Sequence, residues 1–216
     1  MENHCTSSLY LDLGVQDYQE TLLIQKKIHG QRSDNLIPDT FIFVEHKPVF
    51  TIGREAKPEN YTGLNPILVE RGGDVTYHGP GQLVMYPIVR VFNPGESPDL
   101  RKFVRWVEEI VTKSLENLGF SVHLGNEPGL WVSNGPMGDR KVASVGMKVR
   151  NGVSFHGVSI NYGKESLTGF SKIRPCGLDP TEMGYLGIEK NTLMKELVST
   201  LNSRYGKIES VGIAEI

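Results

Sequence analysis

The alternation of apolar and polar positions along the chain predicts a protein built mainly from strands. Short runs rich in β-branched and aromatic residues, bounded by glycine or proline, are typical of strands. Such runs occur at 9–14, 41–46, 48–53, 67–69, 83–91, 120–124, 130–132, 141–150 and 153–160. Because they arrive in consecutive groups with few helices between them, the pattern indicates an α+β domain rather than a regular βαβ winding.

Three segments instead have the spacing of apolar residues that is typical of helices. We expect helices at 15–30, 98–118 and 193–205. Gly30 is a plausible C-terminal stop for the first, because glycine readily takes the left-handed conformation that ends helices. The second has the strongest pattern, with Ser97 as its N-cap, Pro98 as its first residue and Gly119 as its end.

The dipeptide Asn151-Gly152 separates two of the expected strands. Asn-Gly is the strongest short signal for a type I′ turn, so 141–150 and 153–160 are expected to pair as an antiparallel hairpin. Residues 54–66 are polar with two prolines and are expected to form a loop. From 161 to 190 the sequence predicts irregular structure.

The stretch 70–82 holds four glycines and a proline within thirteen residues, and apolar runs lie on both sides. A core strand has little use for so much glycine, which adds no side chain to the packing. Glycine is needed where the backbone takes a positive φ or where another molecule comes close. We therefore interpret the stretch as a loop that wraps a ligand; a bulged turn between two strands is the alternative.

Length and composition add little to this picture. The chain has 216 residues, so a single domain covering 1–216 is expected. Hydrophobic residues make up 38% and charged residues 22%, and the net charge of −2 does not suggest nucleic-acid binding. No apolar run approaches the length of a membrane span, and the first residues lack the pattern of a signal peptide. We expect a cytoplasmic protein without a membrane or nucleic-acid partner.

Neither the cysteines nor the histidines have the spacing of a metal site. The two cysteines, Cys5 and Cys176, form no Cys-x-x-Cys pair, and the six histidines match no ligand motif. We therefore expect no metal. The sequence also lacks the phosphate-loop, dinucleotide-binding and nucleophile-elbow motifs.

Cys176 is a candidate nucleophile because of its neighbours. Pro175 fixes the chain before the thiol, Gly177 lets another group approach after it, and Arg174 can favour the thiolate. From these residues alone, a reactive and an inert thiol are equally supported.

A nucleophilic thiol also needs a base or a cation. The candidates are His78 in the glycine-rich stretch, His156 after the expected hairpin turn, and Lys141 if it is partly desolvated. On its own, Lys141 is more typical of a solvated strand end, and either histidine of a structural residue.

The motifs together resemble a known family. The run 71–82, Arg-Gly-Gly-Asp-Val-Thr-Tyr-His-Gly-Pro-Gly-Gln, resembles the signature of the octanoyltransferases of lipoate synthesis (LipB type). Four further motifs resemble those of the family and follow in its order: 43–46 with 49–53, 141–146, 154–157 and 175–177.

The resemblance implies a central mixed, largely antiparallel sheet flanked by helices, similar to the catalytic domains of biotin and lipoate protein ligases. It also implies that Cys176 carries the acyl group as a thioester and that Lys141 is its partner in proton transfer, without a cofactor. The implied substrate contacts are Arg71, Gly72, Gly73, Asp74, Val75, Thr76, Tyr77, His78, Ser144, Val145, Gly146, Gly157, Val158 and Ser159.

The implied reaction moves octanoate from acyl carrier protein to a lysine of lipoyl domains, in 2-oxoacid dehydrogenases and the glycine cleavage H protein. Both partners are small acidic proteins, so a local basic rim is expected. Its candidates are Arg71, Arg140, Lys141, Lys148, Arg150, Lys172 and Arg174. Two alternatives stay open: an ATP-dependent ligase of the lipoate or biotin type, and a non-catalytic acyl-carrier-binding protein.

Overall fold

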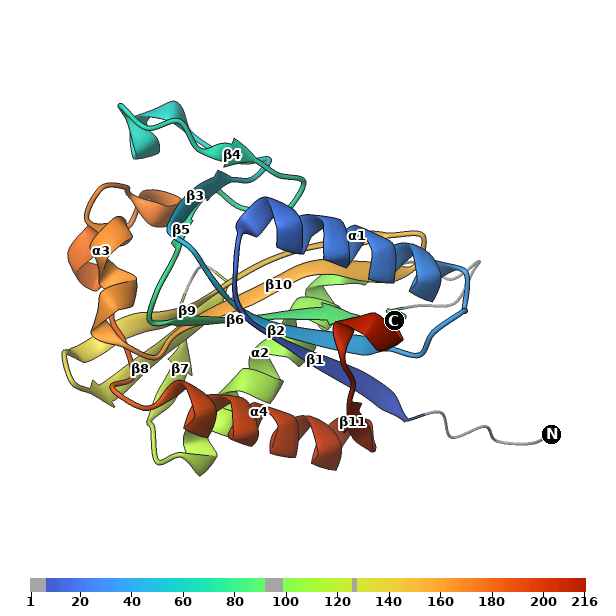
Figure 1. The fold of residues 1–216 in the computed structure, drawn as a ribbon. Helices are drawn as coiled ribbons and strands as arrows, with labels where there is room; N and C mark the ends of the chain where they lie inside the picture. Colours follow the sequence, from blue (N-terminus) through green and yellow to red (C-terminus); the bar gives the residue numbers. More distant parts are fainter. Residues whose placement is uncertain (1–6, 92–98, 126–127) are drawn as a thin grey trace.

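The protein is organised around one large mixed sheet (Figure 1). The computed structural model describes residues 7–91, 99–125 and 128–216. The eight strands lie in the order β11-β1-β2-β6-β10-β9-β8-β7. Strand β1 pairs in parallel with β11 and β2, and all other neighbours are antiparallel. The bounds are β1 Ser8–Gln16, β2 Thr40–His46, β6 Gln82–Ile88, β7 Val122–Leu124, β8 Gly129–Gly135, β9 Gly138–Arg150, β10 Val153–Asn161 and β11 Ile208–Ser210.

Helices cover both faces of this sheet, which confirms the expected fold class. Figure 1 shows α1 on one face and α2 and α4 on the other. The bounds are α1 Tyr18–Ser33, α2 Leu100–Asn117, the short α3 Leu167–Phe170 and α4 Lys190–Tyr205.

Strand β2 shows why the sheet needs both helical layers. Phe41 and Phe43 pack into the cluster that contains the inner faces of α2 and α4. Ile42 and Val44 point to the opposite face, where Ile28 of α1 packs in a second cluster. Because successive side chains of a strand alternate between faces, a strand covered on both sides must be apolar throughout.

A second, three-stranded sheet lies beyond one end of the large sheet (Figure 1). Its order is β4-β3-β5, with bounds β3 Val49–Ile52, β4 Ile67–Leu68 and β5 Val75–His78. Strand β5 lies inside the stretch 70–82, so the prediction of a continuous loop there is wrong. The pairing of β5 with the distant β3 and the burial of Val75 and Tyr77 favour the strand despite the flanking glycines.

The first helix begins and ends later than predicted. Strand β1 continues to Gln16, and the Asp17 side chain then caps the helix by accepting hydrogen bonds from the N–H groups of Gln19 and Glu20. Gly30 lies within α1 rather than at its end. Asn35 instead supplies the left-handed residue, at φ 58°, that closes the helix.

The ends of the other elements follow the sequence more closely. Ser97 and Pro98 lie outside the described residues, and the N-cap is Asp99, which accepts a hydrogen bond from the Lys102 N–H at 2.9 Å. Gly119 follows α2 with φ 88°, as predicted. The hairpin turn is confirmed by φ 50° at Asn151 and 75° at Gly152. Apart from α3 and short 3-10 turns, 161–190 is irregular, as predicted.

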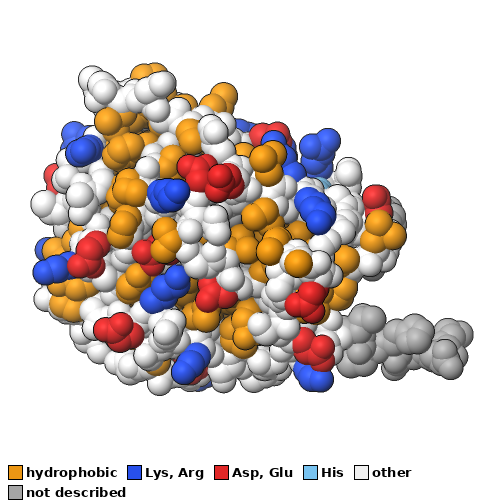
Figure 2. All heavy atoms as spheres, viewed as in Figure 1, with side chains coloured by type: hydrophobic (Ala, Val, Ile, Leu, Met, Phe, Trp, Pro, Cys, Tyr) orange, Lys and Arg blue, Asp and Glu red, His pale blue; other side chains and the backbone are white. Residues whose placement is uncertain are grey.

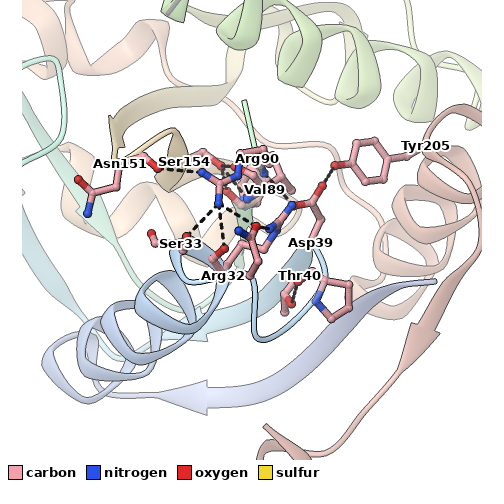
Figure 3. A network of polar contacts seen from close by, with 12 residues as sticks. Arg32, Ser33, Asp39, Thr40, Val89, Arg90, Asn151, Ser154 and Tyr205 are labelled. Carbon is pink, nitrogen blue, oxygen red and sulfur yellow. Dashed lines mark hydrogen bonds and ion pairs between the residues drawn. The ribbon is translucent and has the colours of Figure 1, made fainter. Parts of the chain in front are cut away.

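A polar network closes the hairpin end of the large sheet (Figure 3). The Arg90 guanidinium donates hydrogen bonds to the carbonyls of Ser33 and Asn151, both at 3.0 Å. The Asp39 carboxylate accepts hydrogen bonds from Arg32 Nε at 2.6 Å and from the Tyr205 hydroxyl. These contacts tie the C-terminus of α1, the hairpin and α4 together, and they satisfy helix-end carbonyls that would otherwise lack partners.

Candidate active site

A narrow cavity lies where the small sheet meets strands β9 and β10. Its lining comes from α1, residues 71–74, β5, β6, Pro128, β9, β10 and the turn at 175–177. The lining residues are Tyr18, Arg71, Gly73, Asp74, Val75, Thr76, His78, Val84, Tyr86, Pro128, Lys141, Ser144, Val145, Gly146, His156, Gly157, Val158, Ser159, Pro175 and Cys176.

The structure thus brings both expected catalytic residues and most of the expected substrate contacts to one place. Among the expected contacts, only Gly72 and Tyr77 do not line the cavity. Tyr18, Val84, Tyr86, Pro128, His156 and Pro175 line it as well, although none was among the expected contacts. Which of these residues contact a substrate stays a prediction.

Antiparallel pairing of β9 with β10 unites two distant motifs into one wall. Ser144 lies opposite Ser159, Val145 opposite Val158 and Gly146 opposite Gly157. Gly157 also has a structural role, because a Cβ built there would lie 2.0 Å from the Met85 carbonyl oxygen. The close approach of β10 to β6 therefore requires glycine at this position.

Lys141 is buried near the start of β9, with a relative exposure of 3%. Its aliphatic stem lies against Gly129, where a built Cβ would lie 2.7 Å from Lys141 Cε. The Lys141 carbonyl accepts a hydrogen bond from the Gly184 N–H at 2.9 Å. The interpretation of this residue, taken alone, as a solvated strand end is wrong, because neighbouring strands and the chain after Met183 enclose it.

Cys176 lies in the 3-10 turn Pro175–Gly177 and is exposed. Its backbone is left-handed, with φ 55° and ψ 29°. A residue other than glycine in this conformation is strained by about 1–3 kcal/mol, and such strain concentrates at functional sites. The thiol lines the cavity and is open to solvent, so a large substrate can reach it.

Arg71 places a cation inside the cavity rather than on its rim. Its guanidinium donates hydrogen bonds to the Thr51 carbonyl at 2.9 Å, the Thr51 hydroxyl at 3.0 Å and the Gly72 carbonyl at 3.0 Å. Burial lowers the pKa of Arg71, and nearby Tyr18 and Cys176 oppose that shift. Because Arg71 and Lys141 are both buried, neither belongs to an exposed basic rim.

His78 is a neutral, fixed side chain in this cavity. Gln82 Nε2 donates hydrogen bonds to the Tyr77 carbonyl at 3.3 Å and to Asn161 Oδ1 at 3.0 Å. Gln82 Oε1 therefore accepts a hydrogen bond from His78 Nδ1 at 2.6 Å, which leaves Nε2 of the ring without a proton. Burial lowers the pKa of His78 to about 3.

Other buried rings line the cavity or, as His46 does, pack against rings that line it. His46 Nε2 lies 2.7 Å from the Tyr86 hydroxyl, and burial lowers the pKa of His46 to about 4. Burial and the charge of Arg71 lower the pKa of His156 to about 3. Burial raises the pKa of Tyr18 to about 12. These groups are neutral at pH 7.

Sequence patterns did not reveal Tyr18 and Tyr86 as part of the site. Tyr18 begins a helix, and Tyr86 alternates with core residues along β6. Their place at the cavity depends on tertiary packing, which brings α1 and β6 beside the distant glycine-rich stretch.

The part of the chain that the structure describes contains no group of three or more histidine, cysteine or acidic residues that fits a metal ion. Within the same residues, no helix is both long and apolar enough to cross a membrane.

An accessible thiol, a buried lysine and a buried arginine around one cavity suit nucleophilic acyl transfer. A cation near a thiol favours the thiolate, and the thiolate is the nucleophile. A lysine in a low-dielectric site can exchange protons with a reacting group.

Comparison with solved structures supports the fold. A crystal structure of lipoate-protein ligase A bound with ATP has a TM-score of 0.73 at 14% identity, covering 95% of this chain and 88% of the other. The bipartite lipoate protein ligase of Thermoplasma acidophilum has a TM-score of 0.70 at 16% identity, covering 96% and 86%. The biotin protein ligase of Aquifex aeolicus has a TM-score of 0.51 at 12% identity, covering 91% and 69%.

Comparison with protein sequences is more specific. Residues 17–196 match the model of the lipoyl protein ligase A/B catalytic domain. A probable octanoyltransferase of Pyrobaculum calidifontis is 40% identical over 185 residues, which cover 83% of this chain and 76% of the relative. An octanoyltransferase of Geobacter sp. is 35% identical over 199 residues, covering 90% and 93%. The chain therefore belongs to the lipoyl protein ligase A/B catalytic domain family and is an acyltransferase of the octanoyltransferase type.

Proposed function

We propose that this enzyme transfers an octanoyl group from octanoyl-acyl carrier protein to a lysine of lipoyl domains, through a thioester on Cys176. The observation that carries the proposal is that an exposed, strained Cys176 and a buried Lys141 line the same cavity. The names of the relatives support octanoate as the acyl group.

In the first half-reaction, the Cys176 thiolate attacks the carbonyl carbon of the carrier's thioester. A new carbon–sulfur bond forms, the bond to the carrier's sulfur breaks, and the octanoyl group is left on Cys176. The amine of Lys141 takes up the proton of the thiol and delivers it to the departing carrier thiolate. Exchange of one thioester for another is nearly isoenergetic.

In the second half-reaction, the amine of a lipoyl-domain lysine attacks the acyl-enzyme carbonyl. An amide forms and the bond to the Cys176 sulfur breaks. The attacking amine must be neutral and loses a proton, which Lys141 accepts and returns to the cysteine sulfur. Because a thioester is converted into an amide, this half-reaction runs downhill without ATP.

The apolar part of the cavity is suited to the hydrocarbon chain. Val75, Val84, Val145 and Val158 all line it. Each methylene that they remove from water contributes about 0.8 kcal/mol of binding free energy. The polar and charged groups near Cys176 are left for the thioester carbonyl and the incoming amine.

The test is intact-mass analysis of the enzyme after incubation with octanoyl-acyl carrier protein and no ATP. We expect an octanoyl adduct that hydroxylamine removes and that Cys176→Ala does not form. Cys5→Ser is the matched control and should form the adduct normally. An adduct that persists in Cys176→Ala would falsify the assignment of the thiol.

Two further samples separate the alternatives: one adds a lipoyl domain, and the other supplies the lipoyl domain with free octanoate and ATP instead of octanoyl-acyl carrier protein. An ATP-dependent ligase would modify the lipoyl domain from free octanoate and ATP, and would not need Cys176. A non-catalytic binding protein would retain octanoyl-acyl carrier protein but neither form an adduct nor modify a lipoyl domain. The cytoplasmic location stays a prediction.

A further inference from the structure

The side chain of Tyr77 points away from the cavity, although its neighbours in β5 face it. Thr76 and His78 line the cavity, whereas Tyr77 does not. Tyr77 is buried in a separate cluster with Val75, Phe170, Ile173 and Met183. A strand places successive side chains on opposite faces, so Tyr77 lies on the face opposite Thr76 and His78. Val75 lies on the Tyr77 face, packs in the same cluster and also lines the cavity.

Two glycines make room for the Tyr77 ring. A Cβ built at Gly169 would lie 2.1 Å from Tyr77 Cδ2, and a Cβ built at Gly79 would lie 2.1 Å from the Tyr77 hydroxyl oxygen. The rings of Phe50 and Phe170 lie 5.3 and 5.9 Å away, centroid to centroid. The ring therefore fixes where the segment around α3 packs against β5.

The cluster around Tyr77 is connected to both expected catalytic residues. Ile173 belongs to the cluster and lies shortly before Cys176 in the chain. Met183 also belongs to it and forms a β-bridge with Lys141, and the next N–H, of Gly184, donates to the Lys141 carbonyl at 2.9 Å. The segment between Phe170 and Gly184 thus carries the thiol and contacts the lysine backbone.

A polar connection runs parallel to this apolar one. Asp74 Oδ1 accepts hydrogen bonds from the N–H groups of Val75 at 2.7 Å and Lys57 at 3.0 Å, while Asp74 Oδ2 accepts one from Asn60 Nδ2. The Asn60 carbonyl in turn accepts a hydrogen bond from the Arg174 N–H at 2.9 Å. Asp74 therefore anchors the chain just before Cys176.

We propose that Tyr77 is a positioning residue, whose ring holds the segment 170–184 so that Cys176 faces Lys141, and which contacts no substrate. The resemblance implied instead that Tyr77 contacts the substrate. The inference rests on the proposed function, because it concerns the same transfer. It assigns this side chain to the relative placement of thiol and lysine rather than to recognition of the acyl chain.

The test compares Tyr77→Leu, Tyr77→Phe and Gly169→Ala, all in a Cys5→Ser background. Tyr77→Leu removes the ring, and Gly169→Ala pushes against it. Both should slow acylation of Cys176 by about 10- to 100-fold, because a displacement of about 1 Å at a reacting group has effects of this size. The KM for octanoyl-acyl carrier protein and the preference for eight carbons should stay unchanged. Tyr77→Phe keeps the ring and should react within about twofold of the wild type.

Tyr205→Leu is the matched control, since it removes a partly buried tyrosine ring at the opposite end of the molecule. It should lower thermal stability without slowing acylation at a temperature where the protein is folded. If Tyr77→Leu or Gly169→Ala does not fold, Ile173→Val makes a smaller change in the same cluster and should slow acylation several-fold.

Three results would overturn the proposal. One is a wild-type acylation rate in Tyr77→Leu and Gly169→Ala. Another is a changed chain-length preference in Tyr77→Leu, which would place the ring against the acyl chain. The third is an equal slowing of acylation in Tyr205→Leu, which would attribute the slow acylation of Tyr77→Leu to a general loss of stability.

Alkylation by iodoacetamide separates this inference from the proposed function, because it reports on the Cys176 thiol without any acyl substrate. The rate should change several-fold in Tyr77→Leu and not in Tyr205→Leu. A wild-type protein that never forms an octanoyl adduct would contradict the proposed function, while unchanged alkylation in Tyr77→Leu would contradict the positioning role.

Discussion

At the scale of single residues, burial determines which groups around the cavity carry charge. His46, His78 and His156 are buried, so each is neutral at pH 7, whereas Arg71 keeps a cation in the same space. A neutral His78 that donates from Nδ1 to Gln82 braces its strand. A histidine with so low a pKa is a weak base, which favours Lys141 as the proposed partner of Cys176.

Replacing Lys141 with alanine should leave the fold intact and remove most of the transfer activity. Loss of a proton-transfer group typically reduces the rate by about 10²- to 10⁴-fold. Single-turnover acylation and thermal unfolding should be measured on the same samples. Lys207→Ala, which changes an exposed ion pair with Glu209, is the control and should acylate normally. Wild-type rates in Lys141→Ala would remove this lysine from the mechanism.

The buried histidines predict that stability falls as the pH is lowered. Their folded-state pKa values, about 3 to 4, lie below the usual value of 6.5. Below about pH 6.5 the unfolded chain binds protons that the folded protein does not, so the free energy of unfolding decreases until the folded pKa is reached. Each histidine adds up to about 1.4 kcal/mol per pH unit to this slope.

His156→Asn tests the effect at one site, because asparagine tolerates the left-handed backbone, which has φ 62° here. Denaturant unfolding at about pH 4.5 and about pH 6 should show a shallower pH dependence in the variant than in the wild type. His123→Asn, at an exposed histidine, is the control. Identical slopes in His156→Asn and the wild type would show that His156 titrates normally in the folded protein.

At the scale of elements, local signals predicted turns and helices better than the glycine-rich stretch. The turn at Asn151 depends only on its own backbone preferences, so it was predictable from two residues. Strand β5 depends on pairing with β3, and a loop and β4 separate the two strands along the chain. No local pattern in the sequence indicates this pairing. The prediction of Gly30 as a helix end is wrong because glycine is also tolerated inside a helix. The end of α1 is set by Asn35 instead.

Gly157→Ala tests how closely β10 packs against β6. The added Cβ would overlap the Met85 carbonyl, so we expect a loss of about 1–3 kcal/mol in the free energy of unfolding. Gly30→Ala is the matched control, because a Cβ there meets nothing within 4 Å, and it should gain about 0.5–1 kcal/mol. Equal stability of the wild type and Gly157→Ala would mean that β10 can shift without strain.

At the scale of the whole molecule, the cavity forms at a junction that no single motif specifies. The small sheet contributes the glycine-rich stretch, the large sheet contributes Lys141, and an irregular segment contributes Cys176. Residue chemistry alone did not decide whether the Cys176 thiol is reactive, and it favoured a solvated Lys141. The pairing of Cys176 with Lys141 came from the family resemblance. The strain at Cys176 and the burial of Lys141 required the three-dimensional structure.

The distribution of charged side chains on the surface favours a small group of basic residues, rather than a whole basic face, for binding an acidic partner. On the face shown in Figure 2, acidic and basic side chains are interspersed. Of the expected basic rim, Arg150, Lys172 and Arg174 are exposed. Since exposed charges are screened over about 10 Å at 0.1 M salt, the KM for octanoyl-acyl carrier protein should rise with salt.

Arg174→Gln should weaken this dependence, whereas Arg101→Gln, which changes an exposed charge on α2, should preserve it. Initial rates at several salt concentrations provide the measurement. A KM that does not change between low and moderate salt would count against an electrostatic contribution to carrier binding.

In the proposed reaction, the octanoyl group passes through Cys176 to a lysine amine without ATP. The most direct measurement takes purified octanoyl-enzyme, mixes it with a lipoyl domain in the absence of nucleotide, and follows both proteins by intact mass. We expect the adduct to leave Cys176 and to appear on the lipoyl domain as a hydroxylamine-stable amide, rapidly in the wild type and slowly in Lys141→Ala. An octanoyl-enzyme that stays unreactive, while free octanoate and ATP modify the lipoyl domain, would contradict it.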